Sequence, residues 1–311
     1  MSGHAAMRLT SHTPGCPVSH FMPEASHSYT SERKPVDSCF FHRSFAVEIQ
    51  TCITRNKSTM EKETLYVAFS TQKGGAGKTT LTVLVASYLH YVKGMNVAVV
   101  DCDYPQHSIA EMRKRDLKTV MEDEYYKSMA YRQLQRIGKK AYPVVESTAE
   151  DAVEKAGALL EKMPGTDIVF FDLPGTVNSG GVLGTLANMD YIFSPIAADR
   201  VVMESTLRFA SRLNDTLVAA GKTNIKGLYL LWNMVDGREK SELYGAYEQV
   251  IAELGLKVLK TFLPDSKRFR RELTGGHRAV FRSTLFPVDG TALRGSNLKE
   301  ITEEILSLID R

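Results

Sequence analysis

The chain has 311 residues, of which 43% are apolar and 24% are charged, which is ordinary for a globular protein. The formal net charge of +3 excludes a strongly polyanion-binding surface overall, so a contact with nucleic acid needs a local basic patch. No apolar run reaches the ~20 residues of a membrane-spanning helix, and the N-terminal segment lacks the long apolar stretch of a secretory signal.

The first 59 residues differ from the rest. They hold five of the eight histidines among many Ser, Thr and Pro residues, so we expect a poorly ordered extension in residues 1–59. A metal-binding tract is the alternative for the histidines, although their spacing fits no chelate. Met60 precedes the first strand and is a second possible start of translation. We expect residues 60–311 to form one domain.

From residue 64 onward, apolar strands alternate with helices. Strands are expected at 65–70, 96–101, 142–145, 167–172, 190–195, 226–233 and 256–263. Helices are expected at 79–92, 106–138, 148–162, 202–220, 239–254 and 296–309. Continuous apolar strands between helices are typical of a parallel sheet covered on both faces. The predicted fold class is therefore α/β, with a doubly wound, mostly parallel sheet flanked by helices.

A glycine-rich loop joins the first strand to the first helix and reads Lys-Gly-Gly-Ala-Gly-Lys-Thr-Thr from Lys73 to Thr80. Such a loop brings backbone N–H groups and a helix N-terminus to phosphate oxygens. We expect Lys78 to contact the β- and γ-phosphates, Thr79 to bind Mg²⁺ and Thr80 to contact the α-phosphate. The remaining cradle residues are Gly74, Gly75, Ala76 and Gly77.

The usual loop pattern would place glycine at position 72, where Gln72 stands, and Lys73 is an additional lysine. This form resembles the deviant Walker A motif of the ParA/MinD family of P-loop ATPases. The resemblance covers residues 64–310 and implies a homodimer that sandwiches two ATP molecules. It also implies that Lys73 reaches the partner's nucleotide. A solvated surface lysine is the alternative.

Carboxylates at strand ends supply the acidic partners of a P-loop. Asp172 ends the strand Asp-Ile-Val-Phe-Phe-Asp, resembles the Walker B aspartate and is expected to hold Mg²⁺, with Gly175 near the γ-phosphate. By the same resemblance, Asp103 would position the attacking water and Asp101 would support the metal, although Tyr104 is inserted into the family's pattern. The alternative for each aspartate is a helix cap.

Two later segments resemble those that line the base in this family. Asn233 stands where the family reads adenine, and Pro264 and Asp265 belong to the loop that follows. Turn residues are the alternative. ATP is favoured over GTP because the guanine-reading Asn-Lys-x-Asp is absent; the local sequence is Asn-Met-Val-Asp.

Within the family, the segments at residues 99–108 and 171–181 resemble the ParA-type TraA proteins of conjugative transposons. The last helix is acidic, which argues against placement on an anionic membrane. No cysteine follows Cys102, which argues against an iron–sulfur reductase. The four cysteines form no C-x-x-C pair, which indicates a reducing cytoplasm rather than a zinc site.

A basic cluster near the C-terminus could neutralise DNA phosphates without reading sequence. It consists of Lys267, Arg268, Arg270, Arg271, Arg278 and Arg282. A solvated basic face, or arginines that contact the nucleotide, are the alternatives.

These patterns together predict a cytoplasmic, dimeric Mg-ATPase that converts ATP and water to ADP and phosphate. Its expected task is the partition, positioning or transfer of mobile-element DNA, with a ParB-like or conjugation-apparatus activator. The competing hypothesis is an ATP-dependent switch that positions a conjugation protein complex without binding DNA.

Overall fold

The computed structural model describes residues 63–175, 180–197, 199–218, 221, 223–238, 241–274 and 276–309. The predictions for residues 1–59 and for a start at Met60 lie outside these residues. Within the described part, no helix is both long and apolar enough to cross a membrane.

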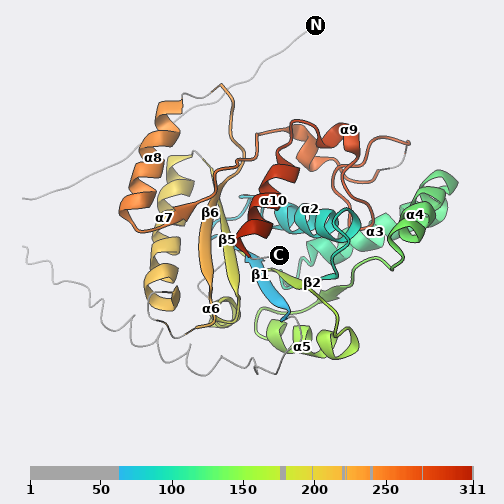
Figure 1. Cartoon of the computed structure of the whole chain (residues 1–311), viewed down its shortest axis with the longest axis horizontal. Coiled ribbons are helices and arrows are strands. Elements are labelled where there is room, and N and C mark those ends of the chain that lie inside the picture. The colour runs from blue at the N-terminus through green and yellow to red at the C-terminus, as the bar shows by residue number, and fades with distance from the viewer. Residues whose placement is uncertain are drawn as a thin grey trace, which may run out of the picture. The chain divides into compact units, whose positions relative to one another are not determined.

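One parallel sheet of seven strands organises the described residues, in the order β3-β2-β4-β1-β5-β6-β7 (Figure 1). Every neighbouring pair is parallel, which confirms the predicted fold class. The strands are β1 (Leu65–Phe69), β2 (Val97–Asp101), β3 (Val144–Glu146), β4 (Ile168–Asp172), β5 (Tyr191–Ile196), β6 (Gly227–Trp232) and β7 (Lys257–Val258).

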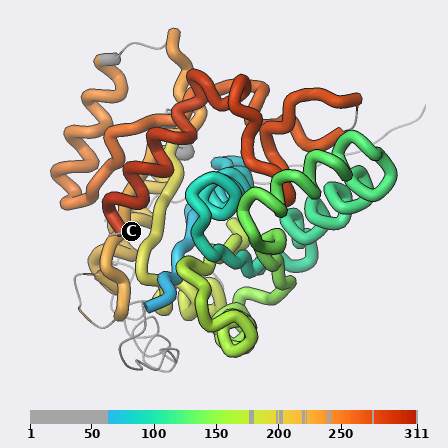
Figure 2. Tube along the Cα trace, turned by 45° about the vertical axis from the view of Figure 1, so that its right-hand side comes forward, coloured from blue at the N-terminus to red at the C-terminus, as the bar shows by residue number. Residues whose placement is uncertain are grey.

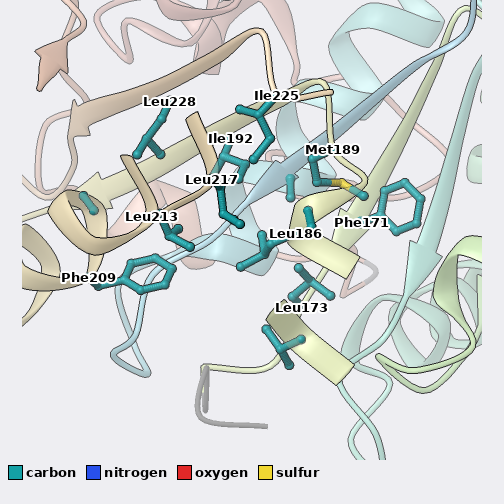
Figure 3. Close-up of a cluster of buried hydrophobic side chains, with 14 of the residues drawn as sticks. Phe171, Leu173, Leu186, Met189, Ile192, Phe209, Leu213, Leu217, Ile225 and Leu228 are labelled. Atoms are coloured by element: carbon teal, nitrogen blue, oxygen red, sulfur yellow. The ribbon is translucent and has the colours of Figure 1, made fainter. Parts of the chain in front are cut away.

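Helices cover both faces of the sheet because successive strand residues point to opposite sides. In β1, Tyr66 and Ala68 enter one core cluster, whereas Val67 and Phe69 enter the other. The first cluster, part of which Figure 3 shows, is covered by α5 (Ala152–Lys162), α6 (Gly180–Ala187), α7 (Arg200–Leu213) and α8 (Ser241–Glu253). The second is covered by α2 (Lys78–Tyr91), α3 (Ser108–Glu122) and α10 (Leu298–Leu308).

Some predicted boundaries are wrong. The charged helix expected at 106–138 is two helices, α3 and α4 (Glu124–Ile137), which lie side by side (Figures 1 and 2). Asp123 separates them because its backbone is extended and its carboxylate accepts the Tyr125 N–H at the start of α4. α7 is followed by a π-helical turn, η1 (Asn214–Val218), within the expected helix 202–220.

The strand expected at 256–263 shortens to the two residues of β7. Beyond it the chain pairs only intermittently with β6, through Leu259 N–H to Leu230 O and Leu263 N–H to Trp232 O. Sequence patterns also missed α6, the short α9 (Gly290–Leu293) and the 3₁₀ turn η2 (Lys267–Arg270).

The parallel register brings the functional strand ends together. Phe69 pairs with Asp172, and Asp172 pairs with Asp101, so the carboxyl ends of β1, β4 and β2 share one edge. The sheet order places β1 between β4 and β5, where the winding direction of the chain reverses. Ligands of doubly wound sheets bind outside such a switch point, and the glycine-rich loop follows β1 there.

His90 on α2 makes the stability of the fold pH-dependent. Its Nε2 lies 2.9 Å from the Lys140 carbonyl, so Nε2–H donates, and its buried Nδ1 has no hydrogen-bond partner in the described residues. Burial lowers the pKa of His90 from 6.5 to about 4. The neutral imidazole therefore contributes stability above pH 6.5, and this contribution is lost as the pH falls toward 4.

We expect this group to remove about 3 kcal/mol of the unfolding free energy between pH 7.5 and pH 4. His90→Gln keeps an N–H for the Lys140 carbonyl but does not titrate. Its unfolding free energy, measured in urea across this range, should fall less steeply than that of the wild type by this amount. Parallel curves for the two proteins would contradict the assignment.

Candidate nucleotide-binding site

The loop between β1 and α2 has a backbone that only glycine adopts readily. Gly75 and Gly77 have φ angles of 81° and 91°. A Cβ on Gly77 would lie 2.5 Å from Nδ2 of Asn233, and that Nδ2 donates to the Ala76 carbonyl at 2.8 Å. Asn233 at the end of β6 thus packs directly beneath the loop.

A cavity of about 390 Å³ opens beside the loop. It brings together residues that the sequence analysis singled out in distant segments, namely Gly74, Gly75, Gly77, Lys78, Thr79, Thr80, Asp103, Gly175, Asn233, Pro264 and Asp265. Lys73, Ala76, Asp101 and Asp172 do not line it. The cavity therefore extends from the phosphate loop to the segment proposed to hold the base.

Asp172 and Thr79 form the pair expected of a magnesium site. The Thr79 hydroxyl donates to Oδ2 of Asp172 at 2.8 Å. Oδ1 of Asp172 is buried and has no hydrogen-bond partner in the described residues, and burial raises the pKa of Asp172 to about 7. A buried carboxylate oxygen without a partner beside a hydroxyl oxygen fits a hard cation, and Mg²⁺ at phosphate sites needs few protein ligands. The residues present therefore fit the ion.

Lys78 lies between the loop and these carboxylates. Its side chain is largely buried, at 8% exposure for the residue, and its Nζ is 3.4 Å from the Lys73 carbonyl. Burial lowers the pKa of Lys78, while the charges of Asp172 and Asp103 act in the opposite direction. The charge of Asp103 raises the pKa of Lys78, and Asp103 also lines the cavity. A carboxylate that positions the attacking water is needed in such a place.

Gly175 closes this end of the cavity. A Cβ there would lie 3.2 Å from Nζ of Lys78 and 3.3 Å from the Gly74 nitrogen. A larger residue would press on the lysine and the loop together. The backbone of Gly175 thus approaches Lys78 and the loop closely, and its predicted place near the γ-phosphate stays a prediction.

Asp101 makes contacts with the start of α3, in addition to the metal-supporting role predicted for it. Its Oδ2 accepts the N–H groups of Ile109 and Ala110, each at 2.9 Å, and its Oδ1 lies 3.4 Å from the Asp103 N–H. Oδ2 therefore caps the first turn of α3, as the helix-cap alternative expects. Oδ1 faces the loop before α3, and its role in supporting a metal stays a prediction.

Lys73 is exposed, and its side chain makes no hydrogen bond or ion pair with the described residues. It stands at the start of the loop but does not line the cavity. A lysine in this position is free to reach a second molecule, which is what the family resemblance requires of it.

The six residues of the basic cluster lie in different environments. Arg268 donates to the Ala292 and Arg294 carbonyls at 3.1 and 2.8 Å, so it ties η2 to α9. Arg270 and Arg282 line the cavity. The residues Lys267, Arg271 and Arg278 remain exposed. DNA binding by these six residues stays a prediction, and the structure shows that their side chains differ in exposure and in partners.

Sequence reasoning missed three further residues of the cavity. Met234, Ser266 and Phe269 line it together with Asn233 and Pro264. No motif identified them. Ser266 and Phe269 follow Pro264 by only two and five residues in the sequence, which could have indicated that they lie at the same site. Together they provide the apolar and polar lining that a nucleobase needs.

Comparisons with known proteins agree with this geometry. The model of the CobQ/CobB/MinD/ParA nucleotide binding domain family matches residues 67–278. The chromosome-partitioning ATPase Soj of Thermus thermophilus is 29% identical over 213 residues, covering 65% of this chain and 82% of Soj.

Two solved structures are similar in fold. Apo McdA from Cyanothece is 14% identical and aligns over 79% of this chain and 100% of its own, with a TM-score of 0.53. The MinD cell division protein of Aquifex aeolicus is 15% identical over 79% and 97% of the two chains, with a TM-score of 0.51.

Proposed function

The chain belongs to the CobQ/CobB/MinD/ParA nucleotide-binding domain family, and on this premise we propose that it is a ParA-type switch that binds Mg-ATP and hydrolyses it to ADP and phosphate. The observation that carries the proposal is the arrangement of Thr79 and Asp172 behind the phosphate loop. Thr79 donates to one oxygen of Asp172, the other oxygen is buried without a partner in the described residues, and Lys78 lies alongside.

Hydrolysis here depends on positioning and charge. The loop amides and Lys78 hold the β- and γ-phosphates against Gly175. Thr79 and Asp172 hold Mg²⁺, which neutralises phosphate charge when it is bound. Asp103 accepts a hydrogen bond from the attacking water and so directs it toward the γ-phosphorus.

Adenine is the proposed base. Nδ2 of Asn233 is used by the Ala76 carbonyl, whereas its Oδ1 accepts no hydrogen bond from the described residues. Oδ1 can accept from the amino group of adenine. Guanine carries a carbonyl at that position of the ring. Its oxygen and Oδ1 of Asn233 are both acceptors, so no hydrogen bond would form between them. Pro264 and Asp265 line the same end of the cavity.

The proposed working form is an ATP-bound homodimer. Lys73 supports it, because this exposed lysine has no side-chain partner in the described part of its own chain. ATP closes the dimer and hydrolysis opens it, so the nucleotide sets which surfaces a partner meets. We propose a ParB-like or conjugation-apparatus protein as the activator, in the cytoplasm.

The proposed task is partition, positioning or transfer of DNA, and the similarity to a protein named for chromosome partitioning supports it. The resemblance of two motif segments to TraA proteins favours a mobile element as the source of that DNA. The basic residues that we propose for DNA are Lys267, Arg271 and Arg278, because Arg268 and Arg282 make hydrogen bonds within the chain and Arg270 lines the nucleotide cavity.

Replacing these three residues by alanine should weaken ATP-dependent binding to random-sequence DNA. Each lost phosphate contact lowers the slope of log affinity against log salt by about 0.9, so the triple variant should lose about 3 units of slope. Gel shift at several salt concentrations with a nonhydrolysable ATP analogue measures both effects.

The matched control replaces Lys155, Lys162 and Arg208, which are also exposed and carry the same total charge. Equal weakening in the control would show a general charge effect rather than a site. Wild-type protein that dimerises on ATP yet ignores DNA at low salt would favour the competing function, the positioning of a conjugation complex without DNA. The observation that favours this second function is the small number of basic residues in the cluster that are both exposed and outside the cavity.

A further inference from the structure

Arg282 lies where two cavities meet. It lines the nucleotide cavity and also a second cavity of about 410 Å³. The second cavity is bounded by Thr79, Gln106, Ser108, Glu111, Met112, Arg115, Glu272 and Arg282. Only 18% of the Arg282 side chain is exposed. A DNA backbone therefore cannot reach it readily, whereas a small ligand inside the nucleotide cavity can.

The structure fixes the Arg282 side chain from both sides. Nη1 donates to the Thr80 hydroxyl at 2.7 Å, and Nη2 donates to Oε1 of Glu272 at 2.5 Å. Oε2 of Glu272 lies 3.1 Å from Nη2 of Arg115. The backbone N–H of Arg282 also donates to the Arg271 carbonyl at 2.9 Å. Glu272 thus lies between two arginines, and Arg282 is the one of them that also lines the nucleotide cavity.

The contact with Thr80 indicates which phosphate Arg282 faces. A hydroxyl has one hydrogen to donate. Because the Thr80 oxygen accepts from Arg282, its own hydrogen remains available for a phosphate oxygen. Lys78 serves the β- and γ-phosphates and Thr79 serves Mg²⁺, so Thr80, one residue farther along the helix, faces the phosphate nearest the sugar.

We propose that Arg282 is a phosphate-binding residue of the nucleotide site, which orients the Thr80 hydroxyl and adds positive charge at the α-phosphate. This inference rests on the proposed function, because it requires a nucleotide at the loop. Arg282 would then contact the nucleotide and not DNA.

A purely architectural role fits Arg282 less well. Its Nε is buried and has no hydrogen-bond partner in the described residues, which costs stability. Arg268, by contrast, gives one nitrogen to two backbone carbonyls of its own fold. Such unpaired donors are concentrated at functional sites, where the ligand rather than the fold selects the residue.

The test compares the affinities of wild type and Arg282→Gln for ADP and for a nonhydrolysable ATP analogue by calorimetry with Mg²⁺. A charge-assisted contact predicts a loss of about 10- to 100-fold. The loss should be equal for both nucleotides, because both carry the α-phosphate. Arg282→Lys, which restores the charge, should recover part of it. Arg208→Gln, an exposed arginine of α7 that lines neither cavity, should bind as the wild type does.

Thr80→Val tests the shared contact. If Arg282 acts through Thr80, the double variant should lose much less affinity than the product of the two single losses. Unchanged affinity in Arg282→Gln would overturn the proposal. So would a loss confined to the ATP analogue, which would place the arginine at the γ-phosphate. Wild-type protein that binds neither nucleotide would instead overturn the proposed function, whereas wild-type binding with an unaffected variant overturns only the role of Arg282.

Discussion

Lys78→Gln is expected to lower the affinity for both ADP and ATP by at least about 100-fold, or ~2.7 kcal/mol. The ammonium group is buried between the loop and two carboxylates. Replacing it leaves the phosphates facing Asp103 and Asp172 without a compensating charge. Calorimetric titration with each nucleotide measures the loss.

Two controls separate binding from folding. Thermal unfolding of Lys78→Gln should show that the variant is folded, because α2 and its core contacts remain. Lys73→Gln removes a lysine five residues away that does not line the cavity, and it should bind ADP as the wild type does. A Lys78→Gln variant with wild-type affinity would remove the basis for the site.

Lys73→Gln should abolish ATP-dependent dimerisation and lower turnover by at least about 100-fold, while the affinity for ADP stays within about threefold of the wild type. A positive charge supplied by a partner chain stabilises the charge that develops on the transferred phosphoryl group. The side chain has no partner in the described residues of its own chain, so its loss should leave the monomer intact. Light scattering with an ATP analogue and phosphate release in single turnovers measure the two effects.

The matched control is Lys162→Gln, an exposed lysine at the end of α5. It should dimerise and turn over normally. If Lys73→Gln lost ADP binding as well, the lysine would act within its own chain. If it dimerised and hydrolysed ATP normally, the surface-lysine alternative would stand.

Local patterns predicted the centre of the sheet because β1, β2, β4 and β5 are buried along their whole length and are therefore almost entirely apolar. Local patterns failed where tertiary contacts determine whether a helix forms and where it ends. Asp123 ends one helix and caps the next inside a uniformly charged stretch. α6 begins with two glycines, which weaken any helix signal, and it forms because its apolar residues Val182 and Leu186 enter the core.

In the candidate site, too, some residues could be placed from the sequence and others could not. Lys78, Thr79 and their loop belong to one contiguous motif, so the sequence could place them against a phosphate. Whether Asp101 binds a metal or caps a helix depends on where the first turn of α3 lies, which only the fold determines. The directions of Arg268 and Arg282 likewise depend on distant partners, Ala292 and Thr80 respectively.

Calorimetry on wild-type protein with Mg²⁺ and a nonhydrolysable ATP analogue tests the central proposal most directly. The cavity between the loop and Asn233 predicts saturable binding of one nucleotide per chain, weakened when Mg²⁺ is removed because Asp172 then lacks its cation. The absence of binding heat with any purine nucleoside triphosphate would contradict the nucleotide site and everything proposed from it.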